Sequence, residues 1–179
     1  MCSSDLAMQE RLWAPWRMQY VSEAGKPSAE CIFCANTAAD EDARTLIVWR
    51  GQLCFVMLNL YPYTSGHLMI APYRHTHDLA SLTNAEWQEL GALTRLCLRA
   101  LEREYRPDGF NVGFNLGRAA GAGIEAHLHM HIVPRWHGDT NFMATLGETR
   151  VLPESLEQTY TRIRNALQEV SASDDGTAR

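Results

Sequence analysis

The chain has 179 residues, of which 46% are hydrophobic, and a formal net charge of −5. This length fits one domain with a substantial core. The negative charge argues against general attraction to nucleic acid or to an anionic membrane. No uninterrupted apolar run approaches the length of a transmembrane helix, and Met1–Leu6 lacks the features of a signal peptide. We therefore expect a soluble, cytoplasmic protein.

The first half of the chain predicts an arm followed by three strands. Residues 1–30 read as an irregular N-terminal arm, and a single domain is expected over 31–170. Apolar and β-branched residues at 45–50 and 53–59 flank Gly51-Gln52, which favours a hairpin. A third strand is expected from about His67 to Ala71.

The second half predicts two helices and two more strands. Thr83 and Glu86 have the spacing of a capping box, so a long helix is expected to begin there and to end before Pro107. Strands are expected near 109–116 and 127–133, followed by a C-terminal helix and a disordered tail over 171–179. These elements indicate an α+β fold with a five-stranded antiparallel sheet.

Three histidines alternate with apolar residues at His127, His129 and His131. On a strand, successive side chains point to opposite faces, so the three imidazoles are expected to share one face while Leu128 and Met130 face the core. Imidazole changes protonation near neutral pH and is a common metal ligand. The row therefore indicates either a metal site or a nucleophile with helper groups.

A glycine-rich stretch, residues 115–125, precedes the histidines. Consecutive backbone N–H groups in a tight loop can bind a phosphate. Its position directly before the histidines suggests a phosphate held against an imidazole.

The five cysteines do not suggest a disulfide framework, because their number is odd and no secretion signal is evident. Cys54 and Cys97 have apolar neighbours and are expected in the core. Cys31 and Cys34 form a Cys-x-x-Cys pair, which is half of a tetrahedral zinc site or a redox pair. The absence of a thioredoxin-like βαβ pattern disfavours the redox alternative.

The segment His127–Val133 resembles the His-φ-His-φ-His-φ-φ signature of the histidine triad (HIT) superfamily of nucleotide hydrolases and transferases, where φ is apolar. Residues 58–72 resemble the first hairpin of that superfamily. Residues 11–20, 109–117 and 133–142 are similar to bacterial diadenosine tetraphosphate phosphorylases of the superfamily. The resemblance covers about 11–170 and implies the HIT fold and a homodimer formed through the long helix and the strand beside it.

The resemblance also implies roles for individual residues. The catalytic residues would be His129, His131 and His127: His129 would be the nucleophile that forms a nucleotidyl-histidine intermediate, and His131 would donate to a phosphate oxygen or the leaving group. The other implied substrate contacts are a ribose contact from Asn59, support from His67, and phosphate contacts from Asn115, Gly121, Ala122 and Gly123. No catalytic metal is required.

The same resemblance implies a structural zinc ion held by Cys31, Cys34, His75 and the first triad histidine, His127. His77 is the alternative third ligand, and His67 a weaker one.

One position departs from the hydrolases of the superfamily. Four residues before the first triad histidine, those enzymes commonly carry Gln or Ser, whereas this chain has Gly123. The missing side chain would leave room for inorganic phosphate, which favours a phosphorylase that converts diadenosine tetraphosphate and phosphate into ATP and ADP.

Three alternatives stay open. One is a hydrolase of dinucleoside polyphosphates or nucleoside phosphoramidates. Another is a metal-dependent hydrolase that uses the three triad histidines and Glu125 as ligands, and the third is a non-catalytic nucleotide-binding protein.

Overall fold

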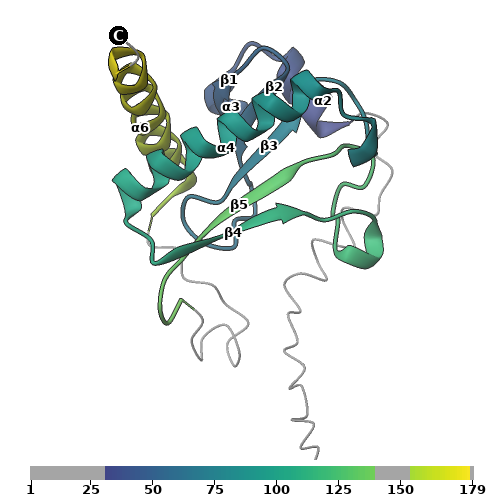
Figure 1. Cartoon of the computed structure of the whole chain (residues 1–179). Helices are drawn as coiled ribbons and strands as arrows, with labels where there is room; N and C mark the ends of the chain where they lie inside the picture. The colour runs from purple at the N-terminus through teal and green to yellow at the C-terminus, as the bar shows by residue number, and fades with distance from the viewer. Residues whose placement is uncertain (1–30, 140–153, 178–179) are drawn as a thin grey trace, which may run out of the picture.

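The computed structural model describes residues 31–139 and 154–177. Within them, five strands form one antiparallel sheet in the order β1-β2-β3-β5-β4 (Figure 1). The strands are β1 (Ile47–Arg50), β2 (Cys54–Leu58), β3 (Leu68–Pro72), β4 (Gly109–Phe114) and β5 (Met130–Arg135). The helices are α2 (Ile32–Ala38), α3 (Asp42–Thr45), α4 (Asn84–Tyr105) and α6 (Leu156–Thr177), with 3₁₀ turns η1 (Leu79–Ser81) and η2 (Arg118–Ala120). The predicted α+β fold, with its sheet, long helix and C-terminal helix, is confirmed.

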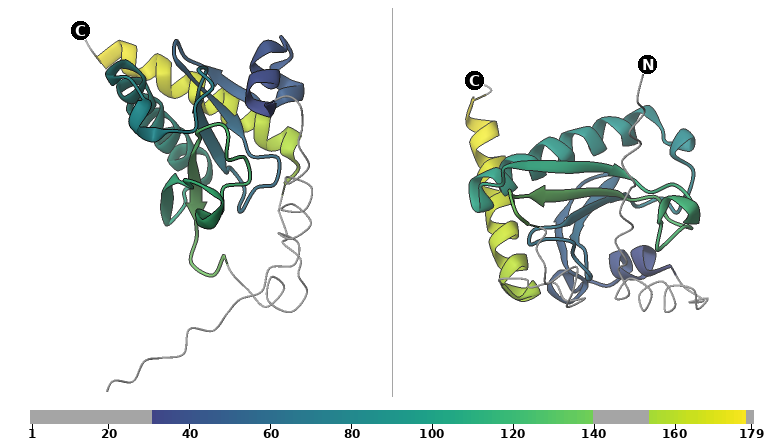
Figure 2. Two further views of the ribbon diagram at one scale, coloured as in Figure 1. Left: turned by 90° about the vertical axis from the view of Figure 1, so that its right-hand side faces the viewer. Right: turned by 90° about the horizontal axis from the view of Figure 1, so that it is seen from below.

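The sheet is covered on both faces, as Figure 2 shows. Helices α4 and α6 pack on one face, where Val56, Ile70 and Ile132 join Leu101 and Leu167 in the larger hydrophobic cluster. Helix α2 covers part of the opposite face, where Phe33 packs against Ile47, Phe55, Met57, Met69 and Ala71. Both faces of the central strands are therefore buried, which explains their continuous apolar sequence.

Helix α4 begins as its sequence predicts. Thr83 Oγ1 accepts a hydrogen bond from the Glu86 N–H, and the Glu86 carboxylate accepts one from the Thr83 N–H. The helix ends at Tyr105, and Arg106 adopts a left-handed conformation before Pro107. Cys54 and Cys97 are fully buried in the core, as expected.

The last strand begins later than predicted. It was expected over 127–133, but β5 begins at Met130, which pairs with Ile70 of β3. β3 ends at Pro72, which has no N–H to extend the ladder. The chain before Met130 is instead held by a hydrogen bond from the Leu128 N–H to the Thr76 carbonyl, 2.6 Å.

Two further boundaries differ. α6 continues to Thr177, so the disordered tail predicted from Ser171 is wrong over most of its length; the Ser173 hydroxyl donates to the Glu169 carbonyl within the helix. The short helices α2 and α3 were not predicted, and α3 takes up Thr45, which shortens the first expected strand. The predicted arm, residues 1–30, lies outside the described residues.

No helix in the described ranges is long and apolar enough to cross a membrane.

Candidate active site and metal centre

The three triad side chains lie on the sheet face opposite α4, on the α2 side. Leu128, Met130 and Ile132 face the α4 core, so the alternating residues between them point toward α2. The rings of His129 and His131 are edge-to-face with centroids 4.9 Å apart. The predicted alternation of faces thus holds although only His131 belongs to the strand.

His129 is held with one ring nitrogen available for chemistry. Its Nδ1 lies 2.8 Å from the His127 carbonyl oxygen. Because a carbonyl can only accept, Nδ1 carries the proton and Nε2 carries the lone pair. Burial lowers the pKa of His129 below its ordinary value, against the opposing effect of that carbonyl. A neutral imidazole at neutral pH is the form that acts as a nucleophile.

His131 is paired with a fourth histidine. His67 Nε2 lies 2.9 Å from His131 Nδ1, and His67 Nδ1 lies 3.1 Å from the Tyr63 N–H. The Tyr63 N–H can only donate, so the His67 proton sits on Nε2 and is donated to His131 Nδ1. The proton of His131 is then on Nε2, which suits this nitrogen to donate to a phosphate oxygen.

Asn59 lies at the same end of the site. Its amide nitrogen is 3.4 Å from His67 Nδ1, and its oxygen accepts from the Tyr61 N–H at 3.0 Å. Asn59 therefore both shapes the turn after β2 and contacts the buried His67.

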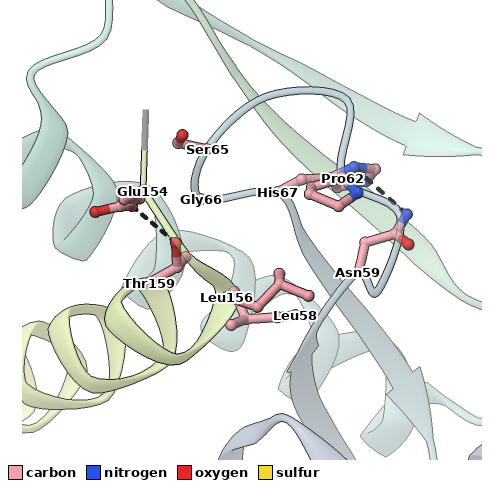
Figure 3. Close-up of a pocket in the computed structure, with 9 residues that line it drawn as sticks. All are labelled: Leu58, Asn59, Pro62, Ser65, Gly66, His67, Glu154, Leu156 and Thr159. Atoms are coloured by element: carbon pink, nitrogen blue, oxygen red, sulfur yellow. Dashed lines mark hydrogen bonds between the residues drawn. The ribbon is translucent and has the colours of Figure 1, made fainter. Parts of the chain in front are cut away.

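Figure 3 shows the pocket next to Asn59 and His67, which lie on one side of it, while Glu154 and Thr159 lie on the other. Leu156 of α6 also lines the pocket. The start of α6 therefore supports the loop that carries His67.

A second cluster contains Cys31, Cys34, His75 and His127, whose ligand atoms all lie within 4.8 Å of one another. Cys31 Sγ is 3.3 Å and Cys34 Sγ 3.7 Å from His127 Nδ1, and Cys34 Sγ is 3.4 Å from His75 Nδ1. Sulfur and nitrogen ligands on a tetrahedral Zn²⁺, with bonds of about 2.3 and 2.0–2.1 Å, lie about 3.5 Å apart. The cluster fits such an ion.

The tautomer of His127 agrees with metal binding. His127 Nε2 lies 2.9 Å from the Pro72 carbonyl oxygen, so Nε2 carries the proton and Nδ1 faces the cysteines with its lone pair. Burial lowers the pKa of His127, which favours the neutral form that a metal requires. The His127 carbonyl anchors His129, whereas the His127 imidazole faces Cys31 and Cys34 and is part of the possible metal-binding group.

The alternative ligands lie elsewhere. Only one group of possible metal ligands is found among the described residues, and four histidines lie outside it: His67, His77, His129 and His131. Glu125, the acidic ligand considered for a metal-dependent hydrolase, pairs with Arg118 at 3.0 Å.

The glycine-rich loop follows β4 at the end of the sheet where β5 begins (Figure 1). Asn115 is half-buried just after β4. Gly121 closes η2 in a left-handed conformation, and Ala122 donates its N–H to the Gly117 carbonyl at 3.3 Å. The loop is therefore a compact turn, and Gly123 lies in it four residues before His127.

Sequence reasoning missed Phe33. Phe33 lies between Cys31 and Cys34 in the sequence, and its side chain is fully buried. Its ring centroid is 4.9 Å from that of His127 and 5.0 Å from that of His129. An aromatic residue inside a Cys-x-x-Cys pair was the available signal, but only the folded chain brings it to the triad.

Comparison with known proteins identifies the family to which this chain belongs. The model of the HIT domain matches residues 41–138. The AP-4-A phosphorylase of Mycobacterium tuberculosis is 43% identical over 158 residues, covering 84% of this chain and 80% of that protein.

Solved structures agree. A zinc-bound histidine triad family protein from Mycobacterium smegmatis superposes with a TM-score of 0.66 at 26% identity, covering 82% of this chain and 99% of that one. A hypothetical histidine triad nucleotide-binding protein from Sulfolobus tokodaii has a TM-score of 0.63 at 25% identity, covering 79% and 94%. The chain is therefore a member of the HIT family.

Proposed function

We propose that this protein is a diadenosine tetraphosphate phosphorylase that works through a nucleotidyl intermediate on His129. The observation that carries the proposal is the hydrogen bond from His129 Nδ1 to the His127 carbonyl, which leaves the Nε2 lone pair for attack. The 43% identical relative named AP-4-A phosphorylase supports the choice of substrate and reaction.

The first chemical step transfers AMP to the enzyme. His129 Nε2 attacks an α-phosphorus of the dinucleotide, so that an N–P bond forms, the bridging P–O bond breaks and ATP leaves. His131 Nε2–H donates to the phosphate oxygens and stabilises the developing charge. The hydrogen bond between His67 and His131 keeps that proton in place.

The second step releases the nucleotide. An oxygen of inorganic phosphate attacks the same phosphorus, the N–P bond breaks, and ADP forms. Gly123 supports this choice of acceptor because it has no side chain where relatives that use water carry one. Asn59 would contact the ribose, and Asn115 with the backbone of Gly121, Ala122 and Gly123 would hold the phosphates.

We also propose that the Cys31, Cys34, His75 and His127 cluster holds a structural Zn²⁺. The zinc-bound relative from M. smegmatis and the ligand spacing support this assignment. The ion would join the start of α2 to the segments after β3 and before β5. No step of the reaction needs it, because the ring nitrogens of His129 and His131 lie outside the cluster.

The protein is further proposed to be a cytoplasmic homodimer. β4 is the last strand of the sheet, so one side of its backbone is open to pairing. Beside it, Trp87 of α4, Val112 of β4 and Leu116 are more than 40% exposed. Light scattering after gel filtration should give twice the chain mass, and Val112→Lys should give one chain mass if this surface forms the dimer.

The proposed reaction is tested by incubating the purified protein with diadenosine tetraphosphate, with and without phosphate, and separating the products. We expect ATP and ADP only when phosphate is present. His129→Ala should abolish turnover, and His137→Ala, a change at an exposed histidine, should not. ATP and AMP formed equally without phosphate would indicate a hydrolase instead.

A further inference from the structure

The orientation of the His129 ring requires more than its hydrogen bond. The bond from Nδ1 to the His127 carbonyl fixes one point of the ring. The torsion between Cβ and the ring is broad in histidine, so the direction of Nε2 changes as the ring turns. Attack on phosphorus needs that nitrogen aligned with the bond that breaks.

Two rings flank His129. His131 meets it edge-to-face, with an interplanar angle of 75°. Phe33 lies 5.0 Å away between centroids, at an interplanar angle of 33°. The His129 ring therefore packs between a catalytic partner and a side chain that has no polar atom.

Phe33 is itself held firmly. Its side chain has no exposed surface and packs against Phe55, with centroids 6.3 Å apart. It lies in the first turn of α2, between the two cysteines of the metal cluster. Its ring also contacts His127, whose carbonyl anchors His129. One side chain thus touches both the proposed nucleophile, His129, and the residue whose carbonyl anchors it, His127.

We propose that Phe33 is a positioning residue for the nucleophile: its ring holds the His129 imidazole in the plane that directs Nε2 at the substrate. This inference deepens the proposed function and rests on it for the identity of the reaction. In this role Phe33 does not contact the substrate or transfer a proton. Because Phe33 is part of α2, its ring contact lets the position of α2 fix the orientation of the His129 ring.

The test compares Phe33→Leu with Phe55→Leu. Both remove a fully buried ring from the same cluster, but the ring contacts of Phe55 are with Phe33 and Tyr73. Formation of the nucleotidyl enzyme is followed in a single turnover with excess protein and diadenosine tetraphosphate. We expect Phe33→Leu to slow this step about 10–100-fold with little change in KM. Phe55→Leu should change the rate less than about twofold while lowering stability by a similar amount.

A readout that does not depend on turnover is the ¹⁵N NMR spectrum of the His129 ring at fixed pH. Phe33→Leu should reduce the population of the Nδ1–H tautomer and broaden the signal, and Phe55→Leu should leave it unchanged. Metal content is measured for each variant. Phe33→Met, whose unbranched, flexible side chain can fill the space left by the ring in a different way, is used for the same measurements if Phe33→Leu does not fold.

Equal rates and equal His129 spectra for the two leucine variants would overturn the proposal. So would a loss of rate that matches a loss of bound metal, because Phe33 would then act only on the cluster. Absence of a nucleotidyl enzyme in the wild type would instead refute the proposed reaction, and the NMR comparison would still decide the role of Phe33.

Discussion

Backbone groups determine which ring nitrogen carries the proton in three histidines of this site. The carbonyls of Pro72 and His127 accept from His127 and His129, and the Tyr63 N–H donates to His67. A carbonyl cannot donate and an amide N–H cannot accept, so each histidine has one neutral tautomer that satisfies its partner. The proposed nucleophile, the proposed metal ligand and the donor to His131 are thereby distinguished although all are histidines.

Replacing His67 should disable His131 as a donor. Without the proton from His67 Nε2, His131 Nδ1 no longer accepts and the ring loses its tautomer preference. We expect His67→Leu to lower kcat about 100-fold, in the range for a positioned proton donor. His67→Gln retains an amide N–H at the end of its side chain and should recover part of that loss. Equal kcat for the two variants would show that the hydrogen bond to His131 is not used.

At the scale of elements, Glu86 connects the start of α4 to the chain after β3. Its side chain is 7% exposed and accepts from Arg74 Nε at 2.9 Å, Arg74 Nη2 at 2.8 Å and the Thr83 N–H at 2.7 Å. The hydrogen bonds from Arg74, aided by those from Thr83, lower the pKa of Glu86 to about 2 despite its burial. Arg74 precedes His75, so this ion pair also holds the segment that carries a proposed metal ligand.

The lowered pKa predicts how stability depends on pH. The unfolded value is about 4.3, so the contribution of the ionised Glu86 is complete above about pH 5. It declines as pH falls through 4 and is lost near pH 2. Glu86→Gln should cost about 1–3 kcal/mol of unfolding free energy at pH 7. Urea unfolding of both proteins at pH 7, 4 and 2.5 should show that difference shrink; a constant difference would contradict the ion pair.

The turn between β1 and β2 depends on a second carboxylate of α4. Glu89 accepts from the N–H groups of Gln52, Leu53 and Cys54 at 2.6, 2.5 and 2.9 Å. A Cβ on Gly51 would lie 2.4 Å from Glu89 Oε1 and 2.7 Å from the Cys54 carbonyl oxygen. Glycine is therefore needed here for space.

Two alanine substitutions should change stability in opposite directions. Gly51→Ala should destabilise by about 1–3 kcal/mol, because neither the carboxylate nor the carbonyl can move without loss of hydrogen bonds. Gly91→Ala, in the middle of α4 with no atom within 4 Å of the new Cβ, should stabilise by about 0.5–1 kcal/mol. Denaturant unfolding measures both, and a stable Gly51→Ala protein would mean that the turn rearranges at little cost.

At the scale of the whole molecule, the proposed metal cluster of Cys31, Cys34, His75 and His127 joins segments that are distant in the sequence. Its ligands come from α2 and the residue before it, from the loop after β3, and from the approach to β5. A ligand that binds only the folded state adds about 2.7 kcal/mol at 100 times its Kd. For a chain of this size, that corresponds to a shift in Tm of about 5–10 °C.

Metal removal is therefore expected to lower Tm by about this amount. The wild type should bind one zinc per chain by elemental analysis, and His75→Ala should abolish binding. His77→Ala is the matched control, because His77 is an exposed histidine two residues away and outside the cluster. Loss of zinc in the His77 variant with retention in the His75 variant would reverse the ligand assignment.

The spacing of apolar residues predicted the fold, because helices and strands bury side chains at different, characteristic intervals along the chain. The capping box at Thr83 and Glu86 begins α4, and the apolar runs of β2 and β3 match central strands. The start of β5 was missed because Pro72 of the neighbouring strand β3 limits it, a cause that is not local in sequence. The end of α6 was missed as well, since the helix continues to Thr177 beyond Val170, its last residue in the core cluster.

By itself, the sequence determined the succession along the chain of the five strands and the two long helices, the family and the identity of the triad histidines, since these depend on residue type and short spacings. Only the tertiary structure decided which ring nitrogen each histidine presents and that Phe33 touches His129. It also brought His75, the ligand that the resemblance implied, and not His77 to the two cysteines. Those outcomes depend on backbone groups and rings brought together from segments far apart in the chain, and no local pattern encodes such distances.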